Sequence, residues 1–168
     1  MHHTEPNPSR AAWLVFAAGV CAALHVGKLP PAIPVLQQAL SLTLVQAGFL
    51  LSLVQLAGMS AGVAFGALAD GLTPRRSMLF GLTLLALASG LGGVVSDVAP
   101  LMALRACEGA GFLLVVLGAP PLIRQLVPPQ RLDLFVGLWS AYMPVATTLA
   151  LLVGPTVMAA FGWRPWWG

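Results

Sequence analysis

The sequence predicts an all-α integral membrane protein of about five transmembrane helices, on three observations. Hydrophobic residues make up 58% of the chain and charged residues only 8%, against roughly 25% charged in a typical soluble domain. The apolar residues form long runs, and a helix needs about 20 of them to cross the hydrocarbon core. Turn residues separate the runs, as in Asp70–Pro74 and at Pro128. A water-soluble domain is therefore excluded.

Five spans are predicted, over residues 12–33, 45–69, 77–95, 100–122 and 134–161. Residues 1–11 are expected to be a cytoplasmic leader, and residues 12–168 a partial transmembrane bundle. Lys28 and the Pro30-Pro31 pair interrupt the first span near its end. A cleaved signal peptide is the alternative for this span, but the leader is only weakly basic and similar spans follow.

The arginines predict the orientation in the cell membrane. Alternating spans place the leader, the 70–76 loop and the 123–133 loop on one side, which holds Arg10, Arg75, Arg76, Arg124 and Arg131. The other side holds only Arg164. Because cytoplasmic loops are enriched in Lys and Arg, we expect a cytoplasmic N-terminus and an external C-terminus. A chain that stops directly after a crossing is expected to be truncated.

Several function classes lack their sequence signals. No basic run provides a footprint for nucleic acid. No metal-ligand spacing, nucleophile elbow or Gly-Lys-Ser/Thr phosphate loop is present. We therefore expect no metal, no other cofactor and no enzymatic activity.

Small residues at four-residue spacing predict close helix packing, since lipid gives helices no hydrophobic reason to associate. Three spans carry such ladders, and they argue for a tight bundle. The ladders are Gly58, Gly62 and Gly66; Ala103, Cys107 and Gly111; and Ala146, Ala150 and Gly154.

The loop after the second span reads Gly-Ala-Leu-Ala-Asp-Gly-Leu-Thr-Pro-Arg-Arg over residues 66–76. It resembles the loop motif between helices two and three of the major facilitator superfamily, G-x-L-a-D-r-x-G-r-r-r. Five residues match the motif: Gly66, Leu68, Asp70, Arg75 and Arg76. The first basic residue and the loop glycine of the motif are missing. The resemblance implies that Gly66, Asp70, Arg75 and Arg76 form a conformational latch.

Two further segments resemble the same superfamily. Arg105-Ala106-Cys107-Glu108-Gly109 is similar to the R-x-x-q/e-G element of its fourth helix, and the fifth span contains Gly154-Pro155. Residues 137–144 and the closing Gly-Trp-Arg look like the cyanate-permease-like branch. Other glycines of the antiporter motif are replaced by Ala141 and Ala150.

The resemblance implies a secondary transporter that works in the lipid bilayer by alternating access around a midplane site. The chain would be its N-terminal part, lacking helix six and the C-terminal half, and a proton is one candidate coupling ion. The alternative is a non-transporting membrane scaffold or assembly partner built from a partial bundle.

Four ionisable residues at membrane depth are candidate site residues: His25, Lys28, Arg105 and Glu108. They form two pairs with i,i+3 spacing, His25 with Lys28 and Arg105 with Glu108, so the two residues of each pair share a helix face. At about 1.5 Å per residue, both pairs fall in the outer half of the bilayer. We expect a cluster in which Glu108 balances Arg105 or Lys28.

The remaining positive charge would favour a small anionic solute, with Arg105 as the bidentate partner of a carboxylate-like group. Structural alternatives stay open: Lys28 snorkelling to the surface, His25 bonding a carbonyl, and Arg105 with Glu108 as an intrahelical pair. Gln55 and Tyr142 are further candidates for polar cavity residues.

Overall fold

The computed structural model describes residues 8–56 and 71–168 of the chain, and every regular element in these ranges is a helix. The all-α class is thereby confirmed for the described residues. The helices are α1 (Pro8–Gly27), α2 (Leu29–Leu40), an unlabelled helix over Leu44–Leu56, α4 (Pro74–Gly92), α5 (Val98–Leu126), α6 (Pro129–Trp139), α7 (Tyr142–Phe161) and α8 (Trp163–Trp167).

Three helical stretches of the described residues are long and apolar enough to cross a membrane: Arg10–Leu40, Val98–Leu126 and Pro129–Phe161. They include the predicted first, fourth and fifth spans. The Leu44–Leu56 helix is apolar but shorter, and the rest of the predicted second span lies outside the described residues. Although α4 overlaps the predicted third span, it is not one of the three. The number of five spans therefore stays a prediction.

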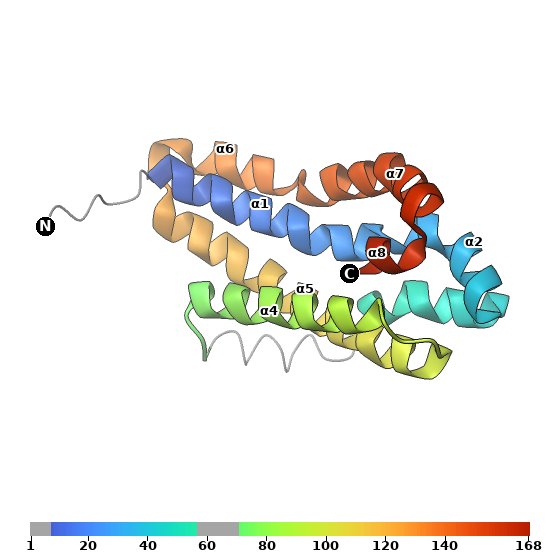
Figure 1. The fold of residues 1–168 in the computed structure, drawn as a ribbon. Coiled ribbons are helices and arrows are strands. Elements are labelled where there is room, and N and C mark those ends of the chain that lie inside the picture. Colours follow the sequence, from blue (N-terminus) through green and yellow to red (C-terminus); the bar gives the residue numbers. More distant parts are fainter. Residues whose placement is uncertain (1–7, 57–70) are drawn as a thin grey trace, which may run out of the picture.

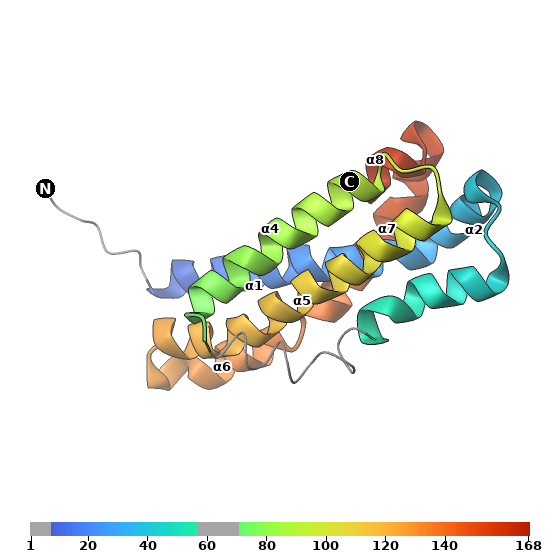
Figure 2. The same ribbon diagram turned by 90° about the horizontal axis from the view of Figure 1, so that it is seen from below.

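The helices pack as a bundle around α1. In Figure 1, α1 runs between the α4–α5 pair and the α6–α7 pair, and α4 and α5 run side by side in Figures 1 and 2. The short α8 lies at the α2 end of the bundle, against α7, α2 and α4. Segments far apart in the sequence thus meet where α1 gives way to α2.

Glycines let the backbones of α4 and α5 touch. A Cβ placed on Gly81 would lie 2.5 Å from the carbonyl oxygen of Gly111, and one on Gly111 would lie 2.8 Å from that of Gly81. The ladder predicted on the fourth span, which corresponds to α5, is wrong in part, because Ala103 and Cys107 are exposed. At about 3.6 residues per turn, each four-residue step drifts by about 40°, so Ala103 is rotated about 80° from Gly111 and the ladder does not stay on the face that meets α4.

The ladder on α7 is confirmed as a packing surface, because Ala146, Ala150 and Gly154 are all buried. A Cβ on Gly27 would lie 3.3 Å from the Cβ of Ala150, so the end of α1 rests closely on this surface. Gly58, Gly62 and Gly66, which form the third ladder, lie outside the described residues.

The first and fifth predicted spans are each divided into two helices. In the first, α1 ends at Gly27 and α2 begins at Leu29, so the predicted interruption is confirmed, although α2 continues beyond residue 33 to Leu40. The fifth span is also divided, at a point that the sequence did not indicate, since α6 ends at Trp139 and α7 begins at Tyr142. Proline explains this break, because Pro144 has no N–H to donate to the carbonyl four residues earlier.

Candidate functional site

The four predicted ionisable side chains lie together between α1 and α5. The Lys28 Nζ is 2.7 Å from Glu108 Oε1, and the Arg105 Nη1 is 2.5 Å from Glu108 Oε2. The His25 Nδ1 lies 4.0 Å from Glu108 Oε1. Glu108 therefore faces both cations, where the sequence left open which of the two it balances. We call these four residues the charged cluster.

Lys28 is buried and its ammonium group is fully engaged. Besides Glu108, it donates to Ser89 Oγ at 2.5 Å and to the carbonyl oxygen of Trp167 at 2.6 Å. An ammonium group has three N–H donors, so these three acceptors complete its hydrogen bonds. The Nζ also lies 4.7 Å from the centroid of the Trp167 ring. Lys28 thus points into the bundle and does not snorkel in this structure.

Arg105 is buried and joins α5 to the end of α1. Its Nη1 donates to Glu108 and to the carbonyl oxygen of His25, and its Nη2 donates to the carbonyl oxygen of Val26 at 3.4 Å. Its Nε has no partner among the described residues. A planar guanidinium suits this arrangement because it presents several donors in a fixed fork.

The charged cluster contains more positive than negative charge. Lys28 and Arg105 supply two cations and Glu108 one carboxylate, which leaves one positive charge when His25 is neutral. Among the described residues, Glu108 is the one buried carboxylate. Because a buried charge is costly unless it is paired, this imbalance marks the cluster as more than a closed ion pair.

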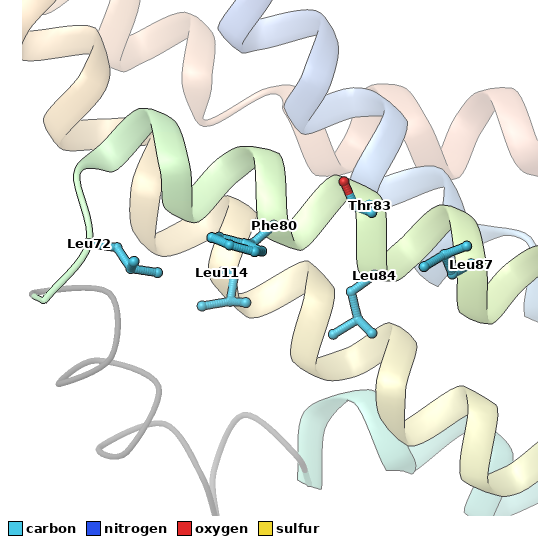
Figure 3. Close-up of a pocket in the computed structure, with 6 residues that line it drawn as sticks. All are labelled: Leu72, Phe80, Thr83, Leu84, Leu87 and Leu114. Atoms are coloured by element: carbon cyan, nitrogen blue, oxygen red, sulfur yellow. The ribbon is translucent and has the colours of Figure 1, made fainter.

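A cavity of about 190 Å³ opens beside the charged cluster. His25 and Lys28 line it from α1, together with Cys21, Leu24, Trp166, Trp167 and Gly168. A second pocket, of about 480 Å³, lies on α4 and α5 and has no charged lining residue. Figure 3 shows the residues that line it: Leu72, Phe80, Thr83, Leu84, Leu87 and Leu114. The smaller cavity is therefore the candidate site for a polar group.

The other two predicted cavity residues lie elsewhere. Gln55 is exposed near the end of the Leu44–Leu56 helix. Tyr142 is half-buried and belongs to an aromatic group, since its ring stacks on Trp139 with centroids 4.4 Å apart and lies 6.5 Å from Phe112. Their assignment to the site stays a prediction.

The predicted latch loop is described only in part. Arg75 and Arg76 are exposed in the first turn of α4, where Thr73 caps the helix by accepting from the Arg76 amide at 3.4 Å. Gly66 and Asp70 lie outside the described residues.

Sequence reasoning missed three partners of the charged cluster: Ser89, Trp166 and the carbonyl of Trp167. Ser89 could have been suspected, because it is a polar side chain in an apolar span. Trp166 and Trp167 are residues typical of a membrane interface, so their type did not indicate a contact with the cluster. The Nε1 of Trp166 donates to the Lys28 carbonyl at 2.9 Å, a contact to backbone that no residue pattern reveals.

The described residues contain no group of three or more His, Cys, Asp or Glu side chains that could hold a metal ion.

A multi-helix bundle with long apolar spans and ion pairs buried between them is the construction of a multi-pass membrane transporter. A sequence model of the Major Facilitator Superfamily matches residues 15–167, and the chain therefore belongs to that superfamily. The resemblance found in the sequence is confirmed at this level.

Known relatives include proteins named for resistance and export. The chain is 27% identical over 131 residues to the tetracenomycin C resistance and export protein of Streptomyces glaucescens, covering 78% of this chain and 24% of that protein. It is 29% identical over 159 residues to the methylenomycin A resistance protein of Streptomyces coelicolor, covering 94% of this chain and 34% of that protein. It is 27% identical over 100 residues to multidrug resistance protein 3 of Bacillus subtilis, covering 60% of this chain and 20% of that protein. The chain spans about a third or less of these relatives.

Proposed function

We propose that this chain is the N-terminal part of a secondary active transporter that exports a small organic solute by alternating access. The observation that carries the proposal is the superfamily match over residues 15–167 together with relatives named for resistance and export. Export refines the sequence-based expectation, which left the direction open. The rest of the transporter would supply helix six and the C-terminal half.

The proposed topology has five spans in this chain and a cytoplasmic N-terminus. The excess of arginines on one side supports the orientation. Residues 12–168 would then form most of one repeat, which rocks against the other around a central site. Gly66, Asp70, Arg75 and Arg76 would form the latch between helices two and three, and membership of the cyanate-permease-like branch stays a prediction.

The proposed solute is anionic, and the net positive charge of the cluster supports this. Lys28 and His25 line the 190 Å³ cavity, so they would meet a solute first. The donors of Arg105 contact Glu108 and the backbone of α1 in this structure. A bidentate role for Arg105 would therefore require these bonds to open during the transport cycle. His25, 4.0 Å from Glu108, is the group we propose for a coupling proton.

A resistance assay tests the proposal. The full-length gene would be expressed in a drug-sensitive host and challenged with matched anionic, neutral and cationic antibiotics. We expect higher inhibitory concentrations for at least one anionic compound, and a loss of this protection in Arg105→Lys and Glu108→Gln. Protection against cationic compounds alone would overturn the anionic assignment. No protection against any compound would favour the scaffold alternative.

A further inference from the structure

The end of α1 has two backbone carbonyls, those of Val26 and Gly27, that lack their usual amide donors four residues later. In a continuous α-helix, each carbonyl accepts a hydrogen bond from the amide four residues later. Pro30 and Pro31 hold the positions that would serve Val26 and Gly27, and proline has no N–H. Within lipid, an unsatisfied carbonyl costs several kcal/mol, so these groups need donors from elsewhere.

Other helices provide donors at this break. The Arg105 guanidinium, on α5, donates to the carbonyl oxygens of His25 and Val26, and Trp166, on α8, donates to that of Lys28. The Leu24 carbonyl is served within the chain by the Lys28 amide at 2.7 Å. Arg105 therefore takes the place of the amide that Pro30 lacks.

The charge of Arg105 also suits this position. The C-terminal end of a helix carries a partial negative charge, which a cation stabilises. Glu108 holds the guanidinium from the other side at 2.5 Å, and the group is almost completely buried. A lysine would retain the charge, but its compact ammonium cannot match a planar fork that reaches a carboxylate and two carbonyls.

We infer that Arg105 is a positioning residue that fixes the break between α1 and α2 by replacing the hydrogen bond lost at Pro30. The inference rests on the proposed function only for its transport readout. It implies that Arg105 and Pro30 are energetically coupled, although one lies on α5 and the other on α2. Lys28, at the break, has helical dihedral angles of −66° and −24°. An amide at residue 30 would thus be close to the direction of the Val26 carbonyl.

The chain offers a matched control for this coupling. Pro30 and Pro34 are both exposed prolines of α2. The amide that Pro34 lacks would serve the carbonyl of residue 30, whereas Arg105 contacts those of residues 25 and 26. Because Pro30 is in the first turn of α2 and Pro34 is inside the helix, each combination with Arg105→Lys is compared with the same proline change alone. Alanine at 34 does not supply the bond that Arg105 replaces.

The experiment is a set of variants of the full-length protein: Arg105→Lys, Pro30→Ala, Pro34→Ala and each proline change combined with Arg105→Lys. One readout is the unfolding temperature in detergent, and the other is efflux of carboxyfluorescein, an anionic dye, from loaded vesicles. We expect Arg105→Lys to lower the unfolding temperature by about 3 °C and efflux about tenfold. When combined with Arg105→Lys, Pro30→Ala should recover at least half of the decrease in unfolding temperature and part of the lost efflux. Pro34→Ala should recover neither.

Equal rescue by the two prolines, or none by Pro30→Ala, would overturn the inference and leave Arg105 as a partner of Glu108 alone. An unchanged unfolding temperature in Arg105→Lys would overturn it as well. Absence of efflux in the unmodified protein would count against the anionic exporter and not against the inference. The unfolding temperatures alone would then decide the coupling.

Discussion

The glycine seam between α4 and α5 and the charged cluster around Glu108 share the helix α5, yet different forces hold them. At the seam, Gly81 and Gly111 bring two backbones into contact with no side chain between them. At the cluster, Glu108 joins Lys28 and Arg105 through ion pairs of 2.7 and 2.5 Å. A close-packed contact such as the seam has a single favourable arrangement, and a change of charge nearby affects it little. Ion pairs can exchange partners.

This difference indicates which region is suited to a transport cycle. The cluster links α1, α4, α5 and α8 through Lys28 and Arg105. A change of charge or of partner there affects four helices together. In the proposed transport cycle, the seam would keep α4 and α5 as a pair while the bonds of the cluster rearrange. The following predictions test this division, from the largest expected effect to the smallest.

Glu108→Ala should be the most damaging single change. It leaves Lys28 and Arg105 as buried cations without a carboxylate, and breaking a buried pair costs about 3–5 kcal/mol. Equilibrium unfolding of the full-length protein in mixed micelles measures the loss. A loss below about 1 kcal/mol would show that water reaches the cluster and screens the two cations.

Gly81→Ala should destabilise the seam by about 1–3 kcal/mol, because its Cβ would lie 2.5 Å from the Gly111 carbonyl oxygen. Gly90→Ala, on the same helix, is the control. A Cβ there meets nothing within 4 Å, so the higher helix propensity of alanine should leave stability unchanged or slightly raised. Both are measured by unfolding in detergent. Equal effects of the two changes would argue against backbone contact at the seam.

Trp166→Phe should cost about 1 kcal/mol, because it removes the donor to the Lys28 carbonyl but retains an aromatic ring. Phe161→Leu is an apolar change on an exposed residue near the same end of the bundle and serves as the control. Unfolding temperatures of the two variants give the comparison. If Trp166→Phe is as stable as the control, the contact contributes nothing to the break.

Thr73→Ala should have the smallest effect, about 0.5–1 kcal/mol, through loss of the cap at the start of α4. Thr73→Ser retains the hydroxyl and should be close to the unmodified protein in the same unfolding measurement. Because Thr73 is not one of the proposed latch residues, transport should fall no further than stability does in either variant. A loss of transport in Thr73→Ala without a loss of stability would show that the cap positions the proposed latch at Arg76.

The sequence predicted the parts of the fold that depend on composition and proline chemistry. Long apolar runs gave the helical class, and Lys28 with its following prolines located the break in the first span. The division at residues 140–141 was missed, because a single downstream proline is also tolerated inside membrane helices. Tertiary contacts decide whether the helix breaks or continues before such a proline, and the local sequence does not reveal those contacts.

The candidate site was predictable to a similar extent. Ionisable residues in apolar spans are unusual enough to be selected by type, and spacing placed each pair on one helix face. Ser89 could have been suspected from its type, but the carbonyls of Val26 and Trp167 were not predictable as partners. Backbone acceptors have no residue identity, and the meeting of α8 with the end of α1 depends on the turn at Gly162, which has a φ of 82°.

The most direct test of the account is transport by the double variant Lys28→Met/Glu108→Gln of the full-length protein. The substitutions remove one cation and one anion, so the net charge of the cluster is unchanged and Arg105 retains its backbone contacts. Arg105 remains a buried cation without a carboxylate, so some stability is lost, but less than in Glu108→Ala, which leaves two such cations. We predict an unfolding temperature between those of Glu108→Ala and the unmodified protein, and at least about a tenfold loss of efflux. Efflux at the unmodified rate would show that the cluster only holds the bundle together, and would contradict its proposed place in transport.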